Sequence, residues 1–123
     1  MHPLDDPSIP DSETLWRRVP VSWIVPDQRN GGTRLSSQAF EGSSDGSGCS
    51  VLLSSQAKLE DVFARHPGMG IAALQALYPR QIGLGVRRVP IPDEPAHAQI
   101  EGNFTHSTKK RLAAAATILV SPT

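Results

Sequence analysis

The sequence predicts a single α+β domain, in which a small, mostly antiparallel sheet of four to six short strands is covered by two helices. Three observations favour this fold class. The apolar runs are short and end at Pro, Asn or Gly. The 11 prolines and 10 glycines among 123 residues favour short elements joined by turns. Turns rather than regular helices separate most of the runs, which argues against a doubly wound parallel sheet.

The first segment differs from the rest of the chain in composition. Residues 1–13 contain three prolines and four acidic residues among few apolar ones. Such a segment buries too little apolar surface to offset the entropy of ordering it. We therefore expect residues 1–13 to form a flexible, acidic, Pro-rich arm and residues 14–123 to form the domain.

Short extended runs follow the arm. Residues 14–19 predict a strand that a proline ends, and residues 21–25 predict either a strand or one helical turn. Residues 27–32 form a loop, since Asn and Gly accept the positive φ angles of tight turns. Residues 34–40 are short and mixed, and residues 41–48, EGSSDGSG, are expected to be a solvated and mobile connection.

The middle of the chain predicts a buried strand and then an amphipathic helix. Residues 49–54 hold three consecutive apolar residues, which is typical of a strand in a core. Residues 55–66 show helical spacing, with Ser55 as the N-cap and a Pro-Gly pair as the stop. The expected buried face of this helix consists of Leu59, Val62 and Phe63.

The next segments return to strands. Residues 70–83 fit helical spacing, but Pro79 interrupts any continuous helix. We prefer a strand over residues 71–75 and a short helix around residues 79–82. Residues 85–89 predict a strand that a proline ends, and residues 96–101 alternate as a strand with Ala96, Ala98 and Ile100 on one face.

The C-terminal segment predicts a helix from Ser107, its cap, to about Leu119. Helical spacing predicts a buried stripe formed by Leu112, Ala116 and Leu119. Lys109, Lys110 and Arg111 occupy successive positions in the first turn, so at least two of them must be exposed.

Charge and cysteine content exclude several function classes. The 12 basic and 12 acidic residues cancel, so no global field attracts the chain to nucleic acid or to an anionic membrane. Cys49 is the single cysteine, which excludes an intramolecular disulfide and favours a small buried residue. No long apolar run and no signal peptide are present, so we expect the cytoplasm as the compartment.

The phrases LWRRVP, RLSSQAF, SVLL, HPGMGIAAL and DEPAHAQIEGN resemble a set of small bacterial proteins without an assigned activity. The resemblance covers about residues 15–119. It implies a free-standing bacterial cytoplasmic domain, and it supplies no catalytic residues.

One arrangement of polar residues favours an enzyme. A basic residue on an early strand is followed by serines after the Asn-Gly-Gly turn. This order is mildly similar to that in the front half of ADP-ribosyl-transferring folds. That resemblance implies a nicotinamide cofactor, with a carboxylate from Glu101 or Glu94 completing the scheme. The alternative function is thus a small transferase or hydrolase that uses a nucleotide or NAD-like substrate. Its candidate catalytic residues are Arg17, Arg34, Ser36, His97 and Glu101. The competing interpretation is a solvated strand whose serines bond to the backbone.

Two further constellations carry weaker signals. Lys109, Lys110 and Arg111 are candidates for binding phosphate or nucleic acid at a helix N-terminus, although so short a charge run is usually solvated. Zinc sites need close pairs such as His-x-x-x-His, and the chain has none. We therefore expect neither a metal nor a cofactor, even though the chain offers His66, His97, His106, Asp93 and Glu101.

The leading hypothesis is a non-enzymatic binding or accessory module that acts through a protein partner. No pair of acid and base groups and no cofactor loop reaches useful specificity. Trp16, Trp23 and Phe40 are aromatic anchors of the kind enriched at interfaces. The alternative for these aromatic residues is that they fill the core.

Overall fold

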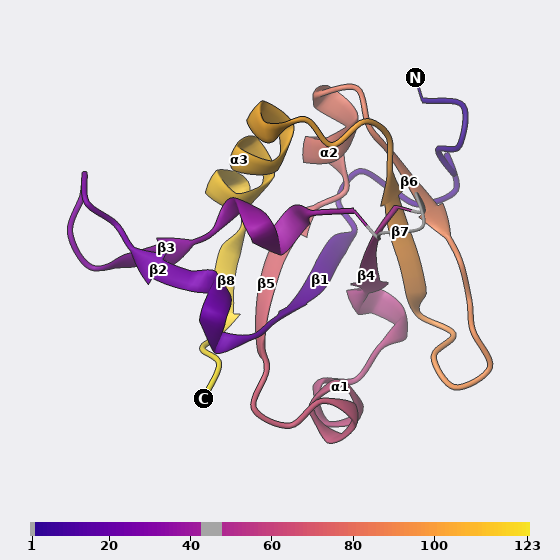
Figure 1. Cartoon of the computed structure of the whole chain (residues 1–123). Helices are drawn as coiled ribbons and strands as arrows, with labels where there is room; N and C mark the ends of the chain where they lie inside the picture. The colour runs from indigo at the N-terminus through magenta and orange to yellow at the C-terminus, as the bar shows by residue number, and fades with distance from the viewer. Residues whose placement is uncertain (1, 43–47) are drawn as a thin grey trace.

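The computed structural model describes residues 2–42 and 48–123, and its main element is a six-stranded sheet (Figure 1). The strand order is β6-β7-β4-β1-β5-β8, and all neighbouring strands are antiparallel. The predicted α+β class with an antiparallel sheet is confirmed. Of the predicted connection at residues 41–48, residues 43–47 lie outside the described part. The strands of the sheet are β1 (Thr14–Val19), β4 (Cys49–Leu53), β5 (Gly70–Gln75), β6 (Gly85–Arg88), β7 (His97–Glu101) and β8 (Thr117–Val120).

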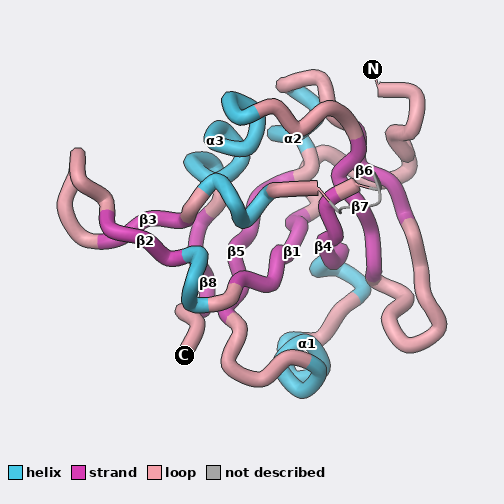
Figure 2. The backbone as a smooth tube through the Cα atoms, in the orientation of Figure 1, coloured by secondary structure: helices cyan, strands magenta, loops and turns pink. Residues whose placement is uncertain are grey.

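A separate hairpin extends from the sheet, as the tube in Figure 2 shows. It consists of β2 (Ile24–Pro26) and β3 (Thr33–Leu35), joined by the predicted Asn-Gly-Gly loop. Both glycines of this loop have positive φ angles, which side chains disfavour. Residues 21–25, predicted to be a strand or a helical turn, form both: the 3-10 turn η1 (Val21–Trp23) leads into β2.

One face of the sheet carries the main core. Helices α3 (His106–Ala115) and α2 (Leu77–Gln81) and the 3-10 turn η2 (Ser37–Phe40) cover it. Alternate residues of each strand point toward this layer because side chains alternate along a strand. The buried residues that meet there include Leu15, Val19, Phe40, Val51, Leu74, Val86, Ile100 and Leu112.

The opposite face carries a smaller core under α1 (Leu59–Arg65). Leu52 and Ile71 of the sheet pack there with Val62 of the helix and with Ala96, and the half-buried Trp16 and Phe63 border them. In Figure 1 this helix lies at the end of the molecule away from α3.

The first predicted helix begins later than expected. Residues 54–56 form a 3-10 turn (η3), and the α-helix starts at Leu59 with Lys58 as an N-cap that makes no side-chain bond. Ala57 is extended and packs against the smaller core, which interrupts the helical path. Ser55 is not the cap: its amide donates to the Glu13 carboxylate at 3.0 Å. Val62 is buried as expected, whereas Leu59 is exposed.

The predicted helix over residues 107–119 is wrong at both ends. Thr105 caps α3 by accepting from the amide of Thr108 at 3.1 Å, and the helix ends at Ala115. The next four residues form β8, which pairs with β5. The β-branched residues of TILV favour a strand, and the free edge of β5 offers backbone partners that a longer helix would forgo. Leu112 is fully buried as predicted, but Leu119 is exposed.

The N-terminal segment is predicted to be a flexible arm, but it packs against the domain at Asp5, Asp6 and Ile9. Ile9 is buried in the main core. The amide of Asp6 donates to the Val86 carbonyl at 2.8 Å, and the Asp5 carboxylate accepts from the Val86 amide at 2.9 Å. These bonds cover the outer edge of β6, so the packed unit includes residues before the predicted boundary at residue 14. The mobility of the segment stays a prediction.

Candidate functional sites

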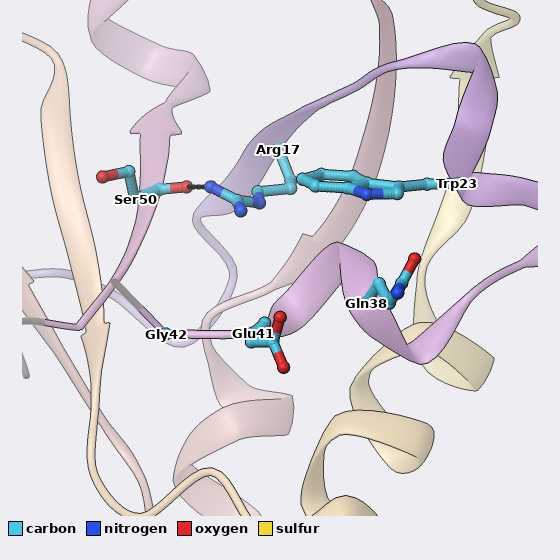
Figure 3. A pocket seen from close by; sticks show the side chains of 6 residues that line it. All are labelled: Arg17, Trp23, Gln38, Glu41, Gly42 and Ser50. Atoms are coloured by element: carbon cyan, nitrogen blue, oxygen red, sulfur yellow. Dashed lines mark hydrogen bonds between the residues drawn. The ribbon is translucent and has the colours of Figure 1, made fainter. Parts of the chain in front are cut away.

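A polar pocket of about 340 Å³ lies beside Arg17 on the main-core face of the sheet. Strand β1 places Arg17 there, since side chains two residues apart share a face and the buried Leu15 and Val19 flank Arg17 on that face. The turn η1 brings in Trp23, η2 supplies Gln38, β4 supplies Ser50, and Glu41 and Gly42 follow η2. Figure 3 shows the six lining residues, with the guanidinium between the indole and the Ser50 backbone: Arg17, Trp23, Gln38, Glu41, Gly42 and Ser50.

Main-chain carbonyls hold Arg17 in place. Its Nε donates to the Ala39 carbonyl at 2.8 Å, and its Nη1 donates to the Ser50 carbonyl at 2.7 Å. The guanidinium carbon lies 5.3 Å from the centre of the Trp23 ring, a cation–π distance. Because backbone atoms from two distant segments fix it, this side chain has a single orientation toward the pocket.

Arg17 also lacks a counter-ion within the described part of the chain. The other half-buried arginines there each pair with at least one carboxylate: Arg18 with Glu94, Arg80 with Asp5 and Asp11, Arg87 with Glu101, and Arg88 with Asp6. No ion pair of this kind involves Arg17. A partly buried cation without a carboxylate is the feature that distinguishes this pocket.

The five candidate catalytic residues do not share a pocket. Ser36 caps η2 by accepting from the Gln38 amide, and the exposed Arg34 lies on the hairpin. On β7, Ala98 and Ile100 face the main core, so His97 and Glu101 point to the opposite face from Arg17. The enzyme hypothesis required these side chains to converge, and the described geometry separates them.

His97 and Glu101 have structural partners instead. The Nδ1 atom of His97 lies 2.8 Å from the Val89 carbonyl oxygen. The buried Glu101 carboxylate lies 3.6 Å from Arg87 Nη2. Both contacts join β7 to the neighbouring segment, so they hold the edge of the sheet together.

Glu94 ties the loop before β7 to β1. A hydrogen bond from Arg18 at 2.7 Å, together with the positive charges of Arg18, Arg65 and His97, lowers the pKa of the Glu94 carboxyl below its usual value. Desolvation opposes this shift but does not cancel it. Glu94, a possible carboxylate for the enzyme hypothesis, is thus the ion-pair partner of Arg18.

The basic residues of α3 are not one free cluster. Lys109 Nζ lies 3.2 Å from a Glu41 carboxylate oxygen, whereas Lys110 and Arg111 are exposed, as expected for at least two of the three. Their role toward phosphate or nucleic acid stays a prediction. Cys49 is buried, and burial raises the pKa of its thiol. Within residues 2–42 and 48–123, no three His, Cys, Asp or Glu side chains are grouped to hold a metal ion.

A second hollow, which we call the β8 groove, lies between α2 and β8 and has a volume of about 560 Å³. Two leucines at its wall are exposed, Leu77 by 37% and Leu119 by 54%. Every lining residue is uncharged. They are Thr14, Ala73, Leu74, Gln75, Leu77, Tyr78, Gln81, Ala115, Thr117 and Leu119. Sequence patterns do not reveal the groove because they predict a helix where β8 forms; the β-branched TILV run is the available signal.

A bulge explains why Leu119 is exposed. Ile118 pairs with Ala72 and Val120 pairs with Ile71, so Leu119 has no partner on β5. A bulge of this kind redirects side chains and is common at sheet edges and next to functional sites. Strand β8 is also last in the strand order, and its outer edge bonds to no other described strand.

The three aromatic residues expected as anchors differ in exposure. Phe40 is fully buried in the main core, so the prediction that it is an interface anchor is wrong. Phe40 is the last residue of η2 and fills the space between the sheet and α3. Trp16 and Trp23 are half-buried, the first at the smaller core and the second at the Arg17 pocket.

Comparison of the chain with protein-family models, with curated proteins and with solved structures gave no match. The resemblance to small bacterial proteins therefore stays a prediction. Among the helices of the described residues, none has the length and apolar character needed to cross a membrane.

Proposed function

We propose that this protein is a non-enzymatic binding module that acts in the cytoplasm through a protein partner, and that the partner docks in the β8 groove. The observation that carries the proposal is the exposed pair Leu77 and Leu119 at the wall of an uncharged groove. Clustered exposed apolar side chains on a monomer mark interaction sites, whereas isolated ones need no explanation.

The chemistry of the groove specifies its occupant as an extended, apolar, uncharged segment of another protein. A charged segment would lose hydration in the groove without gaining a counter-charge, because none of the lining residues is charged. An apolar segment would instead bury the two leucines and the ring of Tyr78. An uncharged, apolar segment of the partner thus complements this surface.

The neighbouring edge of β8 adds backbone partners for such a segment. The opposite edge of the sheet is closed, since Asp5 and Asp6 bond to Val86 of β6. Strand β8 has no equivalent cover among the described residues. An extended segment lying along β8 would satisfy exposed N–H and C=O groups there, as in β-strand addition.

Photo-crosslinking in cells tests the proposal. A benzophenone amino acid replaces Leu119 in one variant and Val21, an exposed apolar residue on η1, in the matched control. We expect Leu119 to crosslink one protein through an uncharged, apolar segment, and Val21 not to do so. With that protein purified, Leu119→Asp should weaken binding by at least about tenfold, because it buries an unpaired carboxylate.

Three results would contradict the proposal. The first is equal crosslinking from Leu119 and Val21, which indicates random collisions. The second is a crosslinked segment rich in charge, which the groove cannot neutralise. The third is a crosslink to a second copy of this chain, which would make the groove a self-association surface instead.

A further inference from the structure

We propose that the pocket beside Arg17 binds a small organic oxyanion that carries a flat ring. This site is separate from the β8 groove and does not depend on a protein partner. Arg17 supplies the positive charge and Trp23 supplies an aromatic surface. The rest of the wall consists of Gln38, Glu41, Gly42 and Ser50.

The first step concerns charge. Removing a cation from water is costly unless an anion or hydrogen-bond acceptors replace the water. The other half-buried arginines of the described chain meet that cost with carboxylates, whereas Arg17 has only the carbonyls of Ala39 and Ser50. Carbonyl dipoles orient the guanidinium, but no carboxylate among residues 2–42 and 48–123 compensates its full charge. An oxyanion in the pocket would supply the missing charge.

The second step concerns geometry. A guanidinium is a planar fork whose N–H groups match the paired oxygens of a carboxylate or a phosphate. Two bonds to the backbone fix the plane of Arg17 and leave its other N–H groups without an acceptor among the described residues. Figure 3 shows the Arg17 guanidinium between Ser50 and Trp23, among the residues that line the pocket. A fixed donor loses little entropy when a ligand binds, which favours affinity.

The third step concerns the rest of the ligand. The half-buried indole of Trp23 lines the same pocket, and aromatic surfaces favour contact with flat rings. Among the described residues that line the wall, Glu41 is the one carboxylate, and it is paired with Lys109 at 3.2 Å, so Arg17 has no carboxylate partner in the described part of the chain. A volume of about 340 Å³ lies at the small end of the range for ligand pockets. These features fit an oxyanion joined to one ring system.

A fluorescence titration tests this assignment. Trp16→Phe makes Trp23 the single tryptophan, so its emission reports on the pocket. The ring-bearing probes are adenosine monophosphate and phenylacetate, which differ in their oxyanion; adenosine and inorganic phosphate test each half alone. We expect at least one ring-bearing probe to quench the Trp23 emission saturably. It should do so at a lower concentration than adenosine alone or inorganic phosphate alone. The probe that binds identifies the oxyanion as phosphate or carboxylate.

Variants establish that the site is the one described. Arg17→Met should weaken binding of the active probe by at least about tenfold, because a charge-assisted forked contact is lost. Arg34→Met, which removes an exposed arginine on the neighbouring hairpin, should leave it unchanged. Arg17→Lys, which keeps the charge without the fork, should give an intermediate loss. If Arg17→Met does not fold, Trp23→Leu measured by calorimetry should show the loss instead.

Two outcomes would overturn the proposal. One is the absence of saturable binding by both adenosine monophosphate and phenylacetate. The other is equal weakening by Arg17→Met and Arg34→Met, which would indicate attraction to surface charge rather than a site.

Discussion

Replacing Leu112 by Ala should destabilise the fold by about 3 kcal/mol, because this side chain is fully buried where α3 meets the sheet. The change removes three carbon atoms, and each buried methylene contributes about 0.8 kcal/mol. The transfer free energy alone is therefore about 2.4 kcal/mol. The cavity left in the main core raises the cost.

Urea unfolding followed by tryptophan emission measures the effect. The midpoint should fall while the slope of the transition stays constant, since the surface exposed on unfolding hardly changes. Lys110→Ala is the matched control on the exposed side of the same helix and should change stability by less than about 0.5 kcal/mol. If both variants were equally mild, α3 would not be docked on the sheet, and the main core described above would be incorrect.

Two further predictions concern the sheet and its ion pairs. Gly70→Ala should loosen β8, because an added Cβ would collide with the Val120 carbonyl and with Pro122. Hydrogen exchange at Thr117–Val120 should accelerate, whereas Gly32→Ala, in the hairpin loop, should leave those amides unchanged; equal protection in both variants would contradict the pairing. Glu94→Gln should remove part of the pH dependence of folding stability. The folded-state pKa of Glu94 is lowered by Arg18, so its stabilisation is present above the unfolded value of about 4.5 and is lost as pH falls through the folded pKa. The wild type should exceed the variant in stability at neutral pH and lose that advantage in acid; a constant difference across this window would refute the pairing.

Local sequence patterns predicted most of the sheet because the physics that forms its strands is local. Residues 14–19 are a short run that stops at a proline, and they form β1 with the predicted bounds. The strand expected over residues 71–75 forms β5, whereas the short helix expected around residues 79–82 begins earlier, as α2, with Pro79 inside its first turn. For β1, the proline at position 20 determines where the strand ends.

The errors arise where distant contacts override local preference. The alanine run of α3 favours a longer helix, yet pairing with β5 turns residues 117–120 into a strand. Ser55 is a good helix cap in isolation, but Glu13, 42 residues earlier, binds its amide. Neither partner is visible in a short window of sequence.

The candidate sites follow the same rule. Arg17 was singled out by its residue type and its place on an early strand. Its importance depends on carbonyls 22 and 33 residues away and on the absence of a described carboxylate, which only the fold reveals. His97 and Glu101 were grouped with it from sequence order, but the alternation of β7 turns them to the other face.

The central claim is that the β8 groove is the docking surface for a partner segment. The most direct measurement is a nitrogen–proton correlation spectrum of the labelled protein, recorded while a synthetic peptide of the crosslinked segment is added. We predict shifts concentrated at Leu77, Thr117 and Leu119, with Val21 unchanged. Shifts confined to the Arg17 pocket, or spread evenly over the surface, would contradict the claim.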